Sequence, residues 1–217
     1  MKDYKTVYLG GEDEIVEKKS RFIATVEAVE TEEEALAFIE KTKKKYWDAR
    51  HNCFAYVIGK ENPSLRCSDD GEPQGTAGKP MLDVIVGEEL CNVCVVVTRY
   101  FGGTLLGTGG LVRAYSRSTK AGLLASVVIE KKSAWEAELT CDYNWIGKLQ
   151  YICGSLQIPI LSTEYTENAT MKFLVPIEKK GQFESQVIEA TSAKVPVSFI
   201  KEVYFAKIDG EYTIFDA

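Results

Sequence analysis

The chain has 217 residues, of which 45% are hydrophobic and 27% are charged. Such values are typical of a globular protein with one large domain or two small ones. No apolar run is long enough for a bilayer-spanning helix, and the charged start of the chain does not resemble a signal peptide. The net charge of −6 argues against a uniformly basic nucleic-acid binder. We therefore expect a cytoplasmic protein without a membrane partner.

The six cysteines are scattered and lie mostly in apolar patterns of a chain large enough to need no disulfides. This favours reduced thiols, in keeping with the cytoplasm. Cys91 and Cys94 have the spacing of a metal-binding pair, but no second pair matches it and His51 is the only histidine. We predict neither a metal site nor a cofactor.

Alternating patterns in the first part of the chain predict strands over residues 5–9, 14–18, 21–29 and 51–58. A helix is predicted to begin at Thr31, because Thr31 and Glu34 have the spacing of a capping box in which Glu34 reaches the Thr31 amide. The lysines near residue 45 suit the C-terminal end of that helix better than a nucleic-acid patch. Residues 59–78 are rich in Gly, Pro, Asp and Ser and predict an irregular exposed loop. A short helix over 80–86 follows.

The stretch from Cys91 to Ala125 carries the strongest local signal. Residues 93–97 are an apolar run typical of a buried strand. Residues 102–110 contain five glycines, and a helix is predicted to open at Leu111 behind a Thr108 cap. A strand, a glycine-rich loop and a helix start together favour an anion site, because unpaired backbone amides face the ligand there. The alternative is a tight turn whose glycines serve only close packing.

Charge supports the anion interpretation. Between Glu89 and Glu130 there is neither Asp nor Glu, yet arginines and a lysine remain at helical spacing behind the loop. Buried elements that simply lack acids would explain the first observation but not the second. The aromatic pair after Arg99 could stack on a base or cap the core. The candidate anion-binding or nucleic-acid-binding residues are Arg99, Tyr100, Gly102, Gly103, Gly107, Gly109, Gly110, Arg113, Arg117 and Lys79.

Two nucleotide-binding motifs are excluded. Gly78-Lys79 is followed by Pro80 rather than by the Ser or Thr of a phosphate-binding P-loop. Gly107 and Gly109 begin a dinucleotide fingerprint whose third glycine is replaced by Val112. The loop therefore signals neither ATP nor NAD.

A weaker catalytic candidate lies elsewhere. His51, Asp69, Asp70 and Glu72 could form an acid–base or metal cluster if the long loop folds back on the strand start. No nucleophile is obviously paired with His51, and a hydrogen-bonded residue at a strand end is the alternative.

The second half of the chain predicts a separate domain. Its elements follow the order βαββαβ of a ferredoxin-like fold, and we place the boundary between domains of residues 1–131 and 132–217. The predicted strands cover 134–141, 160–165, 170–176 and 195–208, and the helices cover 144–157 and 179–191. The chain as a whole is predicted to be α+β.

Four segments resemble the IMPACT/YigZ family: KSRF at 19–22, ARHNC at 49–53, SDDGEPQGTAGKP at 68–80 and VTRYFGGTLLGTGGLVRAY at 97–115. The resemblance implies an N-terminal domain like the second domain of ribosomal protein S-five and the fourth domain of elongation factor G. It implies a C-terminal domain like the fifth domain of that factor. Eukaryotic relatives regulate translation initiation by binding the activator of an amino-acid-starvation kinase. They carry an extra N-terminal interaction domain, which we expect this chain to lack because the family motif begins within its first twenty-odd residues.

We therefore expect a non-catalytic protein that regulates translation. Its partner would be the ribosome, RNA or a translation-related protein, bound through the glycine loop and the arginine helix. The alternative is a hydrolase or other enzyme for a small anionic substrate, with His51, Asp69 and Asp70 near the loop. The oligomeric state is open, with a monomer favoured.

Overall fold

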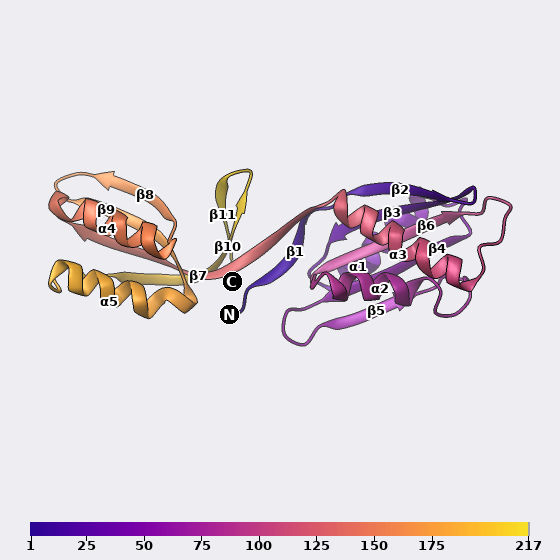
Figure 1. Cartoon of the computed structure of the whole chain (residues 1–217), viewed down its shortest axis with the longest axis horizontal. Helices are drawn as coiled ribbons and strands as arrows, with labels where there is room; N and C mark the ends of the chain where they lie inside the picture. Colours follow the sequence, from indigo (N-terminus) through magenta and orange to yellow (C-terminus); the bar gives the residue numbers. More distant parts are fainter. Residues whose placement is uncertain (217) are drawn as a thin grey trace. The chain divides into compact units, whose positions relative to one another are not determined.

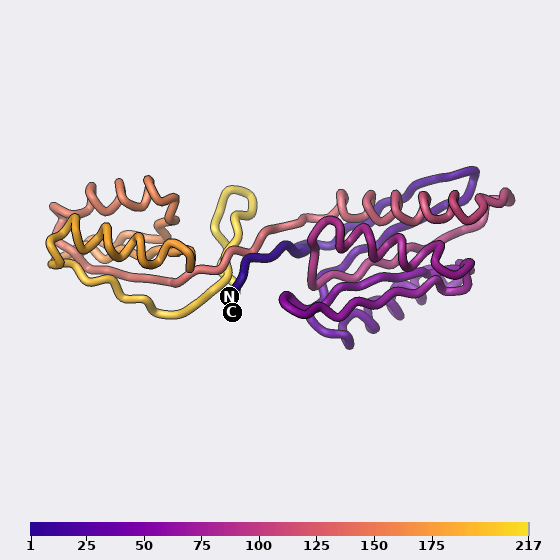
Figure 2. Tube along the Cα trace, turned by 60° about the horizontal axis from the view of Figure 1, so that its bottom comes forward, coloured from indigo at the N-terminus to yellow at the C-terminus, as the bar shows by residue number. Residues whose placement is uncertain are grey.

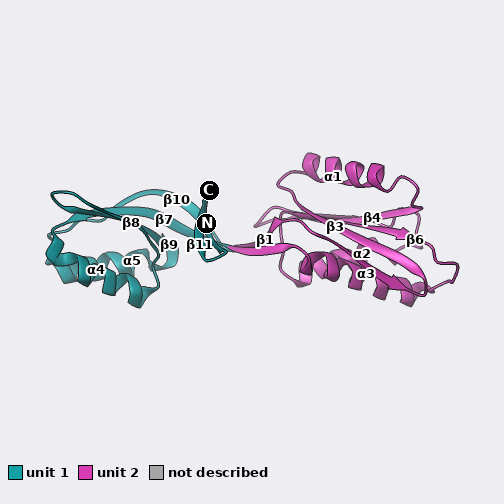
Figure 3. Ribbon diagram, turned by 90° about the horizontal axis from the view of Figure 1, so that it is seen from above, with its two compact units in different colours: residues 1–3, 131–217 teal, residues 4–130 magenta. Residues whose placement is uncertain are grey.

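The computed structural model describes residues 1–216, which group into two compact units. One unit is Tyr4–Glu130, and the other combines Met1–Asp3 with the chain from Lys131 onward (Figure 3). In residues 1–216, no helix is both long and apolar enough to cross a membrane.

The first unit is built on an antiparallel sheet of five strands in the order β2-β3-β6-β4-β5. Helix α1 covers one face of this sheet, and α2 and α3 cover the other, so the unit has three layers (Figure 3). The strands are β2 (Glu12–Glu17), β3 (Ser20–Ala28), β4 (His51–Ile58), β5 (Ser64–Ser68) and β6 (Val93–Tyr100). The helices are α1 (Glu32–Lys45), α2 (Gly78–Gly87) and α3 (Thr108–Leu124).

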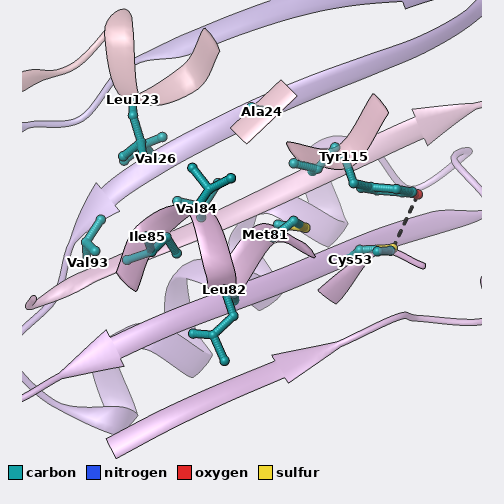
Figure 4. Packing of buried hydrophobic residues seen from close by; sticks show 14 of the residues in the cluster. Ala24, Val26, Cys53, Met81, Leu82, Val84, Ile85, Val93, Tyr115 and Leu123 are labelled. Carbon is teal, nitrogen blue, oxygen red and sulfur yellow. Dashed lines mark hydrogen bonds between the residues drawn. The ribbon is translucent and has the colours of Figure 1, made fainter. Parts of the chain in front are cut away.

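Strand β6 is the central strand of the sheet, between β3 and β4, and both of its faces are buried. Val93, Val95 and Val97 pack into the cluster under α2 and α3, while Cys94 and Val96 join the cluster under α1. Figure 4 shows the first cluster, where Met81 and Ile85 of α2 and Tyr115 and Leu123 of α3 close over the sheet. The buried strand predicted over residues 93–97 is confirmed and extends to Tyr100.

Helix α1 is capped as its sequence predicts, with one difference. The Thr31 hydroxyl accepts a hydrogen bond from the Glu34 amide at 3.2 Å. The Glu34 carboxylate accepts from the amide of Glu30 at 2.6 Å and not from Thr31. The Glu34 side chain thus bonds to an amide one residue earlier than a capping box predicts, and this bond stabilises the segment that leads into α1.

The sheet of the second unit has the order β11-β10-β7-β9-β8. Strand β1 (Tyr4–Leu9), which pairs with β7, belongs to the first unit, as do the first residues of β7. Without β1 and β11, the remaining four strands have the 4-1-3-2 order of a ferredoxin-like domain, which confirms the α+β fold class. Helices α4 and α5 run side by side over one face (Figure 2). The strands are β7 (Val127–Cys141), β8 (Ile160–Tyr165), β9 (Ala169–Pro176), β10 (Ser198–Ile208) and β11 (Glu211–Phe215), and the helices are α4 (Tyr143–Leu156) and α5 (Lys180–Thr191) (Figure 1).

Several predicted elements are wrong in detail, among them the strand predicted over residues 134–141, which begins at Val127. The segment expected to be an irregular loop contains β5, an edge strand whose residues are mostly exposed and so show no hydrophobic alternation. The last predicted strand begins at Ser198 and is followed by β11, which was not predicted. Helix α3 begins at Thr108 behind the cap residue Gly107, three residues before the expected start at Leu111.

Candidate functional site

The start of α3 has unpaired amides, as an anion site needs. Gly107 caps the helix with a φ of 68°, and no side chain bonds to the first turn. The amide of Leu111 is the first to bond within the helix, to the Gly107 carbonyl at 3.0 Å. No acidic residue lies in the first turn. The cap is therefore Gly107 and not Thr108, and Gly109 and Gly110 belong to the helix itself.

The glycines of the loop serve different purposes. A Cβ on Gly102 would lie 2.0 Å from the carbonyl carbon of Lys19, so close packing requires glycine there. The Gly102 amide also donates to Ser20 Oγ at 3.1 Å. Gly103 has a φ of +82° with open space around it, so its backbone conformation alone favours glycine. The packing alternative therefore holds for Gly102 but does not explain Gly103.

Arg113 and Arg117 lie together at the surface. Both are exposed and line a cavity of about 110 Å³, whose other walls include Lys18 and Leu106. Arg117 Nη1 lies 3.0 Å from Glu17 Oε2. Lys120 lines a separate groove between α2 and α3. The three cations predicted to form one face therefore lie in two places: Arg113 and Arg117 line one cavity, and Lys120 lines another.

Arg99 is placed quite differently. Its side chain is 6% exposed, and its Nη1 donates to Glu72 Oε1 over 2.6 Å. Tyr115 donates to the same oxygen at 2.8 Å. The guanidinium also lies over the rings of Phe22 and Phe101, 5.3 and 5.7 Å from their centroids. Arg99 is thus an internal ion-pair partner, inaccessible to a phosphate in this conformation.

Tyr100 and Lys79 also have partners within the unit. The Tyr100 hydroxyl donates to Asp48 Oδ1 at 2.7 Å, and Arg21 lies over its ring at 5.4 Å. Burial, followed by the Asp48 carboxylate, raises the pKa of Tyr100 to about 12. Lys79 is exposed and pairs with Asp83 one turn along α2. Neither side chain lines the cavity beside Arg113.

His51 contacts Asp70, but through the Asp70 backbone, and it has no described hydrogen bond to Asp69. His51 Nδ1 lies 2.9 Å from the carbonyl oxygen of Asp70, so this nitrogen is the donor. The Asp70 carboxylate accepts from the Asn52 amide at 2.7 Å and lies 3.3 Å from Lys43. No carboxylate bonds to the imidazole among the described contacts, so they show no acid–base pair. Residues 1–216 also contain no group of three His, Cys, Asp or Glu side chains that could hold a metal.

Instead, the Asp69 side chain accepts hydrogen bonds from backbone amides at the N-terminal end of α2. Its carboxylate accepts from the amides of Gly75, Ala77 and Gly78 at 2.8, 3.0 and 2.9 Å. Partial burial acts to raise the pKa of Asp69, but these amides outweigh it and the pKa is lowered. Asp69 is thus the anion bound at one helix start, whereas the start of α3 has none from the chain.

Lys18 and Lys19 were missed by sequence reasoning. They form the two-residue turn between β2 and β3, with Glu17 paired to Ser20. Their φ angles are 46° and 68°, a left-handed pair that favours Asn and Gly. The sequence does place both lysines at the turn expected near Ser20, between two predicted strands, but it does not show that this turn lies beside Arg113. Lys18 lines the cavity with Arg113.

Comparison with known proteins identifies the chain. The Impact N-terminal domain matches residues 18–123, and a domain of unknown function, DUF1949, matches residues 139–194. The IMPACT family member YvyE of Bacillus subtilis is 42% identical over 204 residues, which cover 94% of this chain and 94% of that protein. This chain belongs to the IMPACT family.

Two further matches cover most of the chain. The family member YigZ of Escherichia coli is 35% identical over 187 residues, covering 85% of this chain and 92% of that protein. A crystal structure described as that of a hypothetical protein matches with a TM-score of 0.59 and 32% identity. It covers 93% of this chain and 98% of its own.

The segments that carry the IMPACT resemblance meet in one buried network. Cys53 lies 3.3 Å from the Tyr115 hydroxyl (Figure 4), and Tyr115 and Arg99 both bond to Glu72. Burial raises the pKa of the Cys53 thiol and keeps it neutral. These residues come from three of the four segments, so much of the signature maintains the scaffold. Arg113, in the same signature, is exposed.

Proposed function

We propose that this IMPACT-family chain regulates translation as a cytoplasmic, non-catalytic binding protein. Its partner would be the ribosome, RNA or a translation-related protein. The resemblance of the signature segments to IMPACT proteins supports the process, because eukaryotic relatives act on translation initiation. The kinase-pathway partner of those relatives is not carried over to this chain.

The contact surface in this proposal is the start of α3 with its two exposed arginines. The observation that carries it is the cavity that gathers Lys18, Arg113 and Arg117 in a protein of net charge −6. Arginine binds phosphate oxygens with a planar fork of donors, and amides at a helix start add to this. A phosphate backbone fits such a surface, whose cations lie exposed rather than buried among apolar groups.

The test is the salt dependence of binding to purified ribosomes and to single-stranded RNA. The double variant Arg113→Ala/Arg117→Ala should weaken binding and flatten the plot of log K against log salt by about 0.7 to 0.9 per lost phosphate contact. The matched control is Lys172→Ala/Lys201→Ala, which removes two charges from the second unit, where these lysines lie 3.9 and 3.8 Å from Glu138 and Glu136.

The control variant should keep the wild-type slope. Equal slopes for all three proteins, or no association with ribosomes or RNA, would contradict the RNA form of the proposal. Affinity capture from cells with and without RNase then separates an RNA-mediated partner from a protein partner.

A further inference from the structure

We propose that the cavity between the β2–β3 turn and α3 is a site for one phosphate group, and that Glu17 is its built-in competitor. This inference rests on the proposed function of the same surface. It adds the size and charge of the ligand and a residue that weakens its binding.

The size of the cavity restricts the ligand. Its volume is about 110 Å³, and water occupies about 30 Å³ per molecule in the liquid. The cavity is therefore large enough for a small anion such as one phosphoryl group. Pockets that enclose whole drug-sized molecules usually measure about 300 to 1,000 Å³. A base or sugar attached to the phosphate must therefore remain outside.

The charges around the cavity match a phosphate. Lys18, Arg113 and Arg117 contribute three positive charges and Glu17 one negative charge, which leaves two positive charges in balance. A backbone phosphodiester carries one negative charge, and a terminal phosphate monoester carries about −1.5 to −2 at pH 7, so the positive charge at the cavity suffices for either. Within residues 1–216, neither Lys18 nor Arg113 lies within 4.0 Å of a carboxylate oxygen, and Arg117 pairs only with Glu17. Two of the three cations are therefore without a carboxylate partner.

Glu17 holds the place that a phosphate oxygen would take. Its Oε2 lies 3.0 Å from Arg117 Nη1, and the two side chains are 35% and 62% exposed. Carboxylate and phosphate oxygens accept the same fork of guanidinium donors. An incoming phosphate competes with this carboxylate for Nη1 of Arg117, and it must remain near the negative charge of Glu17. Both effects weaken binding.

The turn that carries Lys18 supports the assignment. Lys18 and Lys19 both have left-handed backbones, where Asn and Gly fit better. Replacing them with Asn and Gly should make the turn more stable and remove a cation from the rim of the cavity. Unfavourable backbone geometry often accompanies binding surfaces.

The experiment titrates the full chain with inorganic phosphate and follows backbone amide shifts by NMR. In the wild type, the amides of Lys18, Gly110 and Arg113 should shift together. Glu17→Gln should bind phosphate about 5 to 10 times more tightly, which is within the range expected for removing one opposing charge. Arg113→Gln/Arg117→Gln should abolish the shifts.

The matched control is Glu14→Gln. Glu14 is also 35% exposed and pairs with an arginine, Arg21, at 2.7 Å on the neighbouring strand. This variant has the same net charge as Glu17→Gln, so it should bind phosphate within twofold of the wild type. Equal tightening in both variants would overturn the competitor role of Glu17. A lack of phosphate shifts in both the wild type and Glu17→Gln would overturn the site.

Binding of the same variants to ribosomes and RNA distinguishes this inference from the proposed function. If Glu17→Gln binds phosphate no better than wild type while the arginine variant loses RNA, the competitor role fails and the function stands. If Glu17→Gln binds phosphate more tightly but no variant changes ribosome or RNA binding, the site stands and the function fails. Urea midpoints for each variant show whether the fold is retained.

Discussion

Arg99 donates to Glu72 across 2.6 Å inside the first unit, and both side chains are almost fully buried, at 6% and 4% exposed. Removing one member of such a pair leaves a charge that water cannot reach. Glu72→Gln should therefore lower the free energy of unfolding by about 3 to 5 kcal/mol. Urea denaturation measures the loss, and Glu14→Gln, which breaks an exposed pair, should cost less than about 1 kcal/mol.

A double replacement tests the same relationship further. Arg99→Met with Glu72→Met removes both charges together, so no buried charge remains. Such exchanges are often neutral or stabilising, and the double variant should be more stable than Glu72→Gln. A double variant that is less stable would show that the hydrogen bond from Tyr115 to Glu72, rather than the ion pair, carries the stability.

Asp69 makes stability depend on pH. Its pKa is lowered in the folded protein, so its contribution is complete above the unfolded-state pKa of about 3.9 and is lost as the pH falls through the folded-state pKa. Asp69→Ala removes the acceptor of all three amides and should cost about 0.5 to 2 kcal/mol at pH 7, the range for replacing a helix-capping side chain by alanine. Urea titrations should show that this difference shrinks below about pH 4. A constant difference would exclude Asp69 as its source.

Substitutions in the glycine loop should have unequal effects. Gly102→Ala puts a Cβ 2.0 Å from the Lys19 carbonyl carbon, and the backbone of two segments must shift, which costs about 1 to 3 kcal/mol or more. Gly109→Ala meets only the end of Arg113 at 3.6 Å. It lies in a helix, where alanine is favoured by up to about 1 kcal/mol. Thermal unfolding midpoints should fall for the first variant and hold or rise for the second.

The cysteines should differ in reactivity. All six are free, and of them only Cys67 is exposed. Burial raises the pKa of Cys53 and Cys94, and it raises the pKa of Cys153 to about 12. The pKa of Cys67 is raised as well, so exposure is what distinguishes Cys67 from the other cysteines. A thiol reagent at pH 8 should modify one cysteine quickly in the native protein and the rest only after unfolding. Cys67→Ser should remove the fast phase, and a fast phase that persists would show that a buried thiol is reached by local opening.

Much of the fold follows from patterns within single elements. Val93 to Val97 are apolar on both faces, so a buried strand is predictable there, and the spacing of α4 and α5 between strands predicts the ferredoxin-like order. Strand β5 was not predictable in this way, because Leu65 is exposed and the segment has no buried face. An edge strand of this kind depends on its neighbour rather than on its own sequence.

The site was only partly predictable for a related reason. The helical spacing of Arg113 and Arg117 can be read from the sequence, and in the structure both are exposed. Arg99 has the same residue type, and its burial depends on Glu72, which is far away in the sequence and comes close only through folding. Lys18 is likewise placed beside Arg113 by the sheet. Composition indicates a cationic region, but tertiary contacts decide which cations face solvent.

The position of β6 between β3 and β4 affects how the protein is made. Both neighbours leave the ribosome before β6 and cannot pair with each other in the native sheet. At about 5 to 20 residues per second, the first hundred residues take several seconds to synthesise. From the end of β4 at Ile58 until β6 is complete at Tyr100, β3 and β4 lack their common partner. When β6 emerges, its valine-rich segment is itself a candidate for aggregation. We expect nascent chains to need chaperone protection during this interval, and truncation before Tyr100 to yield insoluble protein.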